Sequence, residues 1–222
     1  MRRFCGRCLV CLFLVVAPLT QVKAACTEPG KARWCLKSSV PAGSDFSHPV
    51  HIALADLLML GDPVPPIKKN DSRYSKTLIP AFDNPFHLKE GDIVQTEGWV
   101  YLIATEGKHC ECHIQIANDS LNGSPCMVVE VPKPDAKSIK SPTVRAKAKS
   151  VRLLILYNLL NGKEPSSGGT ILKHPVYVRF TGQLFYDDYH IGDQPRGKKG
   201  MKAANLWELH PVTAIEFVSP PN

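Results

Sequence analysis

The sequence lacks the short motifs by which several large enzyme classes are recognised. It contains neither a phosphate-binding loop nor a dinucleotide-binding fingerprint, so nucleotide-dependent enzymes of those folds are not indicated. It has no G-x-S-x-G segment of the serine hydrolases and no H-E-x-x-H segment of the zinc proteases. The function must therefore be inferred from the fold and from less specific groups of residues.

Long hydrophobic segments are also scarce, and the longest one lies near the start of the chain. It runs from about Leu9 to Ala17 after three arginines, and it is shorter than the roughly 20 residues of a membrane-spanning helix. The sequence thus predicts a signal peptide over residues 1–24, cleavage before about Ala25, and a secreted or periplasmic protein without a transmembrane segment. The alternative is a lipoprotein acylated at Cys26, although Lys23 stands where an apolar residue is preferred.

Excess positive charge is small once that segment is set aside. The chain of 222 residues has 27 basic and 20 acidic side chains and a net charge of +7. Residues 1–24 contain four of the basic side chains and none of the acidic ones, so the remaining 198 residues carry only +3. Composition alone therefore does not indicate a nucleic-acid-binding protein.

Five cysteines remain after the expected cleavage, in a compartment that favours disulfides. Cys26 and Cys35 are close enough in sequence to close a small loop. In a hairpin around Leu121, Cys112 would face position 130, too far from Cys126 for a bridge. This leaves a bridge between Cys110 and Cys112, or free thiols. Neither a paired-cysteine zinc site nor C-x-x-C redox chemistry is indicated.

Proline marks the part of the chain that follows the signal segment. Residues 25–88 include "GDPVPPIKK" and "IPAFDNPFH" and one apolar piece, "VHIALADLLML", which predicts an irregular arm with one short element. A structural or partner-binding protein of the cell envelope, with this arm as its interface, is one functional hypothesis.

Residues 89–218 change to a pattern of β-branched and aromatic residues. Five strands are expected, in the segments "GDIVQTEGWVYLIAT", "CHIQIAND", "CMVVEVP", "PVYVRFTGQLFYDD" and "LWELHPVTAIEFV". Between the third and fourth lies a predicted helix with Ser141 as its N-cap, Pro142 at its first position and Gly162 just past its end. Gly98 and Gly182 stand inside strands, where a small barrel turns its corners.

This order predicts a mainly β fold: a five-stranded, OB-like Greek-key barrel with one helix between strands 3 and 4, preceded by the proline-rich arm. A generic α+β sandwich is the alternative. The segments "EGDIVQTEGWVYL", "CHIQI", "VYVRFTGQLFYDDYH" and "KKGMKAANLWELHPVTAIEF" resemble a loosely described group of secreted bacterial OB-like proteins whose final strand reads W-E-[IL]-H-P-V. The resemblance covers roughly residues 88–217. It implies an exported OB-like fold and brings no activity with it.

Alternation along the strands predicts which side chains face out of the barrel. In the second strand, Glu111 and its alternate neighbours point outward, and the cysteines point inward. In the first strand the predicted interior residues are Val94, Thr96, Val100 and Leu102. OB barrels bind oligonucleotides or oligosaccharides across such an outer face, and aromatic rings stack on either. The candidate ligand-binding residues of this face are Trp99, Tyr101, His113 and Gln115; alternatively, the arm covers the rings as ordinary packing.

The loop "DYHIGDQPRGKKGMKAAN" joins the fourth and fifth strands and would flank the same face. Its glycines let backbone amides approach a ligand, and its basic side chains attract phosphate or carboxylate groups: Arg196, Lys198, Lys199 and Lys202. These residues extend the candidate binding surface for a nucleic acid or an oligosaccharide. A solvated basic loop without a ligand is the alternative.

Acids and histidines gather where the fourth strand ends and the fifth begins. Imidazoles and carboxylates can hold Zn²⁺ or Mn²⁺ and activate water, which makes a metal-dependent phosphodiesterase the alternative function. The candidate metal ligands are His113, Asp187, Asp188, His190, Glu208 and His210. Their spacing matches no specific zinc signature, and Asp at strand ends also caps turns.

Overall fold

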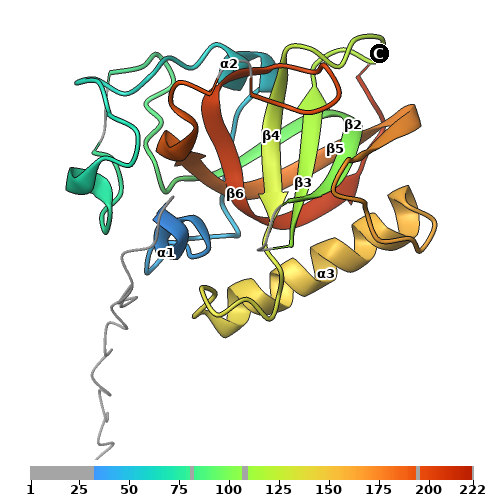
Figure 1. Cartoon of the computed structure of the whole chain (residues 1–222), viewed down its shortest axis with the longest axis horizontal. Helices are drawn as coiled ribbons and strands as arrows, with labels where there is room; N and C mark the ends of the chain where they lie inside the picture. The colour runs from blue at the N-terminus through green and yellow to red at the C-terminus, as the bar shows by residue number, and fades with distance from the viewer. Residues whose placement is uncertain (1–32, 81–82, 107–109, 194–195, 222) are drawn as a thin grey trace, which may run out of the picture.

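Five strands curl into a closed barrel of mixed direction (Figure 1). The computed structural model describes residues 33–80, 83–106, 110–193 and 196–221. The barrel strands are β2 (Ile93–Glu106), β3 (Glu111–Ala117), β4 (Cys126–Val131), β5 (Thr170–Tyr186) and β6 (Ala203–Phe217). Helix α3 (Pro142–Leu159) connects β4 to β5. The predicted five-stranded OB-like barrel, with its helix between the third and fourth barrel strands, is confirmed.

The strands are ordered β2-β3-β4-β6-β5, and pairing of β2 with β5 closes the barrel. All neighbouring pairs run antiparallel except β4 and β6, which run parallel with Val128 opposite Glu208. This parallel contact places the outward side chains of β4 directly beside those of β6. It is therefore the seam at which groups distant in the sequence meet.

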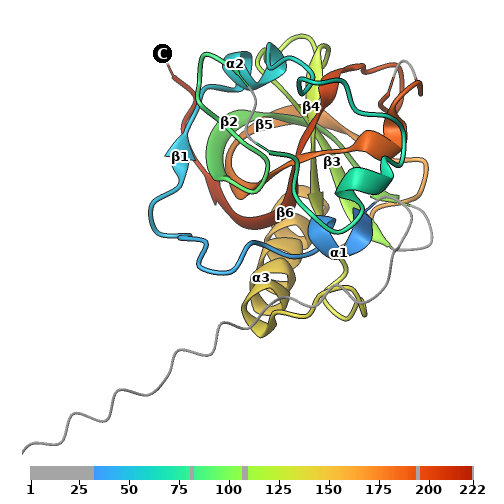
Figure 2. The ribbon, with the colours of Figure 1, turned by 90° about the vertical axis from the view of Figure 1, so that its left-hand side faces the viewer.

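Helix α3 forms as the sequence predicts. The Ser141 side chain accepts a hydrogen bond from the amide of Val144 at 3.3 Å, and Pro142 begins the helix. Its buried side chains, Val144, Ala148, Val151 and Ile155, belong to one stripe, because residues three or four apart share a helix face. Both views place α3 across one end of the barrel (Figures 1 and 2).

A β-bulge in β2 makes one predicted side-chain direction wrong. The pairing with β3 shifts register between Val100 and Leu102, so Val100 lies opposite Ile116 but Leu102 lies opposite Gln115. Leu102 therefore points to the outer side of the barrel and not to the interior. It is nevertheless buried, because the backbone near Gly169 lies over it.

The predicted corner glycines stand at close approaches of backbone and side chain. A Cβ on Gly182 would lie 2.9 Å from the carbonyl oxygen of Pro211, where β5 and β6 shift register. A Cβ on Gly98 would lie 2.6 Å from the side chain of Leu54 in helix α2 (Leu54–Leu58). Helix α2 lies at the end of the barrel opposite α3 (Figure 2).

The arm contains more structure than the one short element that the sequence predicts. Besides α2, it forms helix α1 (Trp34–Lys37), the two-residue strand β1 (Val50–His51), which pairs parallel with β2, and the turn η2 (Ser72–Tyr74). Because such short elements carry few contacts of their own, they depend on the barrel for support. No helix in the described part of the chain combines the length and apolarity that crossing a membrane requires.

The cysteines of the barrel are free thiols. Cys112 lies opposite Val131 in the β3–β4 pair, too far along the strand from Cys126 for a bridge, and Cys110 is likewise unbridged. Burial raises the pKa of Cys112 to about 12, so this thiol is unreactive near neutral pH. The proposed pairing of Cys26 with Cys35 lies outside the described residues, because Cys26 does.

A buried ion pair fastens the arm to the barrel. The Arg33 guanidinium donates to both carboxylate oxygens of Glu90, at 2.8 and 2.6 Å, and to the carbonyl oxygens of Tyr74 and Thr77. Glu90 in turn accepts from the amide of Tyr186 at the end of β5. Both charged side chains are almost fully enclosed. Removing one of them would leave the other charge buried without its partner.

We therefore expect Glu90→Gln to lower the free energy of unfolding by about 3–5 kcal/mol, because it leaves Arg33 buried and uncompensated. Chemical denaturation at neutral pH measures this change. The matched control is Glu97→Gln, which removes a partly exposed pair with Arg179 on the barrel wall and should have a much smaller effect. Equal effects of the two substitutions would contradict the conclusion that the buried Arg33–Glu90 pair fastens the arm to the barrel.

Candidate functional site

Nine polar side chains form a buried network on the outer face of β3, β4 and β6. They come from α1, three strands, the end of β5 and the β5–β6 loop, and each is at most 8 % exposed. The members of this buried polar network are Lys37, Glu111, His113, Gln115, Glu130, Asp187, Arg196, Glu208 and His210. Burial of so many charges is costly unless they compensate one another, so the contacts within the network decide its stability.

Lys37 lies at the centre of the network. Its ammonium nitrogen is 3.1 Å from Glu130 of β4, 3.0 Å from Asp187 at the end of β5 and 2.9 Å from Glu208 of β6. Burial alone would lower the pKa of Lys37, but the three carboxylates outweigh it and hold the pKa well above its usual value. The side chain is therefore a permanent cation.

Arg196 supplies the second fixed positive charge. Its guanidinium lies 3.1 Å from Asp187 and 2.5 Å from Glu208, so it shares two carboxylates with Lys37. Burial opposes the charge of Arg196, yet attraction to Glu208 and Asp187 raises its pKa further. The β5–β6 loop is thus tied down onto the network through this residue.

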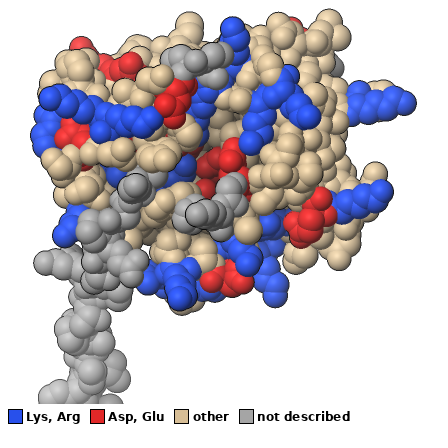
Figure 3. All heavy atoms as spheres, viewed as in Figure 1, with Lys and Arg blue, Asp and Glu red and all other residues tan. Residues whose placement is uncertain are grey.

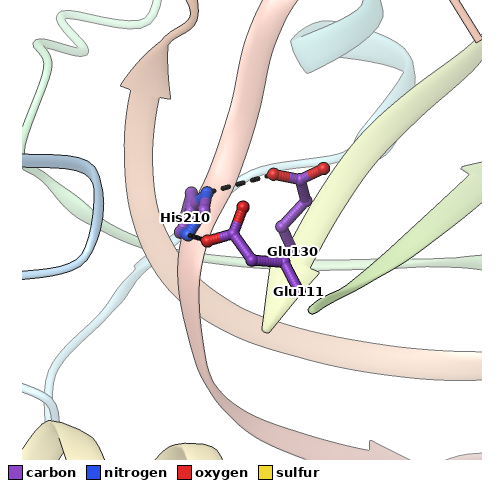
Figure 4. A group of neighbouring side chains, drawn as sticks. All are labelled: Glu111, Glu130 and His210. Atoms are coloured by element: carbon purple, nitrogen blue, oxygen red, sulfur yellow. Dashed lines mark ion pairs between the residues drawn. The ribbon is translucent and has the colours of Figure 1, made fainter. Parts of the chain in front are cut away.

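Glu111, Glu130 and His210 form a group that could hold a metal ion. They stand on β3, β4 and β6, and one donor atom from each lies within 4.8 Å of the others. Figure 4 shows the imidazole between the two carboxylates: Nε2 is 3.0 Å from Glu111, and Nδ1 is 3.2 Å from Glu130. Nδ1 also lies 3.4 Å from Glu208. One imidazole and two carboxylates are ligands that several divalent transition metals accept.

The charges of the network change how its acids and His210 titrate. Burial would raise the pKa of Glu130 and Glu208. Lys37 acts with the imidazoles on Glu130 and with Arg196 on Glu208, and together these groups outweigh burial and hold both pKa values below their usual range. Burial would lower the pKa of His210, but the carboxylates of Glu111 and Glu130 together outweigh it and hold that pKa well above its usual value. Glu130 and Glu208 are accordingly ionised at neutral pH.

The structure brings four of the six predicted metal ligands together. Asp187, Glu208 and His210 are in the network, and His113 joins through Glu130, which it contacts at 2.8 Å. The other two lie apart from it. Asp188 is buried and accepts a hydrogen bond from the amide of Asp71. His190 is partly exposed, contacts Asp193 at 3.1 Å, and lies 3.8 Å from Asp187.

Sequence reasoning missed three members of the network. Glu111 was predicted to face outward but was not treated as a ligand, and Glu130 was overlooked although it alternates with buried valines and pairs with His113 in the β3–β4 register. Both residues would have been found by extending the alternation of inward and outward side chains from β3 to its neighbour β4. Lys37 carries no such signal, because its place depends on how the arm folds back on the barrel.

The predicted ligand-binding residues of the barrel face are mostly engaged within the protein. His113 and Gln115 are on the outer side but buried, and Gln115 accepts a hydrogen bond at 2.7 Å from the amide of Lys198. Trp99 packs edge-to-face on Tyr177 of β5, on the side of β2 away from β3. Tyr101 lies in the bulge and donates to the carbonyl oxygen of Asp119. The face is therefore covered by the chain itself.

Three of the four predicted basic residues remain at the surface. Lys199 and Lys202 are exposed, and Lys198 is half-buried beside Glu106, 3.0 Å away. Arg196 differs because it is inside the network. Figure 3 shows Lys and Arg side chains gathered over the β5–β6 loop. The exposed lysines thus mark the outer surface of the segment that covers the network.

Comparison with known proteins yields no match: no family model matches this chain, and no curated protein is similar to it in sequence.

Substitution of Lys37 tests whether the network depends on its central cation. We expect Lys37→Met to lower the free energy of unfolding by about 3–5 kcal/mol at neutral pH, because three buried carboxylates lose their shared partner. Lys37 lowers the pKa of Glu130 and Glu208, so the stability that it provides is present above their unfolded pKa of about 4.3 and is lost as pH falls through the folded values.

The difference between wild type and Lys37→Met should therefore be largest above about pH 5 and should shrink in acid. Urea denaturation over a pH series measures it. Lys69→Met, which removes an exposed pair with Asp193, is the control and should show a small difference at every pH. A pH-independent loss in Lys37→Met would contradict the electrostatic explanation.

Proposed function

We propose that this protein is an exported OB-like barrel protein that binds an extended anionic ligand on its β5–β6 loop, with oligonucleotides and acidic oligosaccharides as the ligand classes to test. The observation that carries the proposal is the exposure of Lys199 and Lys202 on this loop. Among the residues that the structure describes, neither lysine has a carboxylate partner. Their charge is therefore available to a phosphate or carboxylate of a ligand.

The backbone of this loop is held in place before any ligand arrives. Gln115 holds the amide of Lys198, the amide of Lys202 donates to Ser124 at 3.1 Å, and the carbonyl oxygen of Lys202 accepts from Cys126 at 2.9 Å. A Cβ on Gly197 would lie 2.0 Å from a carbonyl oxygen, so only glycine fits there. A loop fixed in this way loses little conformational entropy when it binds.

The covered barrel face limits where such a ligand can lie. Because the outer sides of β3, β4 and β6 are occupied by the buried polar network, the ligand follows the loop surface and not the strands. The ring of Tyr101 lies beside the loop, because a Cβ on Gly123 would be 3.1 Å from this ring and 2.6 Å from the Met201 sulfur of the loop. The ring could therefore stack on a ligand that follows the loop. The ligand-binding set then consists of Lys198, Lys199, Lys202 and the edge of Tyr101.

A cofactor proposal accompanies this function. The nitrogen and oxygen donors of Glu111, Glu130 and His210 favour Zn²⁺ or Mn²⁺ over softer metals. A hydrolase would need an open coordination position for water or substrate. All three side chains are buried, so we propose a bound ion without a hydrolytic step.

Removing the two exposed lysines tests the binding proposal. In titrations of the full chain with single-stranded DNA, RNA and acidic glycan fragments, we expect binding to weaken as salt rises, because contacts with phosphates release counterions. For a single-stranded nucleic acid, the slope of log K against log salt should fall by about 0.7 for each lysine removed in Lys199→Ala/Lys202→Ala.

The matched control is Lys140→Ala/Lys149→Ala, which removes two exposed lysines just before and within α3, at the far end of the barrel (Figure 1). It should leave affinity nearly unchanged, because these lysines lie away from the loop. Flat titrations for all ligands, or an equal loss in the control, would disprove a binding surface on the β5–β6 loop.

A further inference from the structure

We propose that Glu111, Glu130 and His210 hold one enclosed divalent ion of the Zn²⁺ or Mn²⁺ class, whose role is to balance the charge of the buried polar network and stabilise the fold. This inference rests on the cofactor proposal above and is independent of ligand binding at the loop lysines. It differs from catalysis, because an enclosed ion is not available to a substrate.

The positions of the donors suit such an ion. Ligand atoms around a tetrahedral ion at about 2.1 Å lie about 3.4 Å apart. One donor atom from each of Glu111, Glu130 and His210 lies within 4.8 Å of the other two, so rotations of these side chains would bring all three to coordination distance. Each ligand stands on a different barrel strand (Figure 4). The ion would therefore link β3, β4 and β6.

The imidazole of His210 lacks the hydrogen bonds that a buried polar group normally has. It is fully enclosed, and neither ring nitrogen has an aligned hydrogen-bond partner, although carboxylate oxygens lie close to both. Metal-bound histidines coordinate through one nitrogen and donate the other N–H to a carboxylate. If Nε2 of His210 binds the ion, Nδ1 faces the carboxylate of Glu208 at 3.4 Å, so one ion would satisfy the whole ring.

The charge of the network also favours a dication. Its four carboxylates, Glu111, Glu130, Asp187 and Glu208, are opposed by only two Lys or Arg side chains, Lys37 and Arg196. Two negative charges remain, and a buried excess of this size is expensive. One divalent ion would balance it, and so would two added protons. The two solutions predict different metal contents.

The network encloses the three ligands from the outside. Lys37 of α1 and Arg196 of the β5–β6 loop lie over the face, and Glu111 and Glu130 are at most 4 % exposed. Closed sites of this kind are typical of metals that stabilise a fold, whereas catalytic sites keep a position open. The main measurable effect of ion binding should therefore be a more stable fold.

The full chain, purified without chelator, should contain about one equivalent of Zn²⁺ or Mn²⁺ by elemental analysis. Removing the ion with a chelator should lower Tm, and adding back the metal salt alone at about 100 times its Kd should raise Tm by about 5–10 °C. Metal-free protein that shows no Tm shift with either ion would overturn the proposal and leave protons to balance the charge.

Glu111→Gln tests the ligand assignment, because it keeps the shape of the side chain and removes its charge. We expect metal affinity to fall by about 100-fold or more. The matched control is Glu97→Gln, which lies in β2 and pairs with Arg179 of β5. This variant should bind the ion as the wild type does. Unchanged affinity in Glu111→Gln would overturn the site.

X-ray absorption of the zinc-loaded wild type provides a test that does not depend on a variant folding. The proposal predicts nitrogen and oxygen ligands at about 2.0–2.2 Å and no sulfur. Sulfur at about 2.3 Å would place the ion on cysteine and overturn the assignment. Metal-dependent hydrolysis of a phosphodiester that is abolished in Glu111→Gln would show that the site is open, and so would overturn the enclosed role.

Discussion

A buried ammonium group among three carboxylates is the interaction on which the arrangement of this protein depends. Lys37 belongs to the arm, whereas Glu130, Asp187 and Glu208 belong to the barrel, and its nitrogen lies within 3.1 Å of all three. Without this cation, Glu130 would lose its lysine partner, and Arg196 alone would compensate Asp187 and Glu208. The arm must therefore dock for the barrel to be stable. Arg33, which holds Glu90 from the same stretch of chain, fixes the position from which Lys37 reaches the face.

This docking changes what an OB-like barrel can offer a ligand. The outer sides of the middle strands, where such barrels commonly bind polymers, are here covered by α1 and by the β5–β6 loop. The loop is bound on its inner side through Arg196 and Gln115, and it presents Lys199 and Lys202 on its outer side. The same segment thus closes the face and supplies the exposed charge. The ligand binding that we propose on the loop and the enclosure of the network would both follow from one loop conformation.

Local patterns in the sequence were sufficient to predict the barrel. Ser141 and Pro142 define the start of α3 because capping is a short-range interaction. The direction of Leu102 was predicted wrongly, since a single bulged residue reverses the alternation and leaves no clear mark in composition. The site was predicted in part: Glu208 and His210 lie two apart on one strand, but their partnership with Lys37 spans about 170 residues. Contacts of that range are decided by the packing of the arm and not by any periodicity.

The composition of the network raises the question of why this face of the barrel carries charged residues in place of apolar ones. Well-packed apolar residues would often stabilise such a face as well as paired charges do, so stability alone does not explain four acids and two histidines beneath a surface. Register is one explanation, because Glu130 and His210 meet only when β4 and β6 pair in the observed parallel alignment. It does not account for His210, whose enclosed ring has no aligned hydrogen bond on either side. A group that only specified register would be satisfied by its neighbours, and this one is arranged as a ligand is. The enclosed ring and the excess of carboxylates over Lys and Arg side chains are the two features that the proposed ion would explain together.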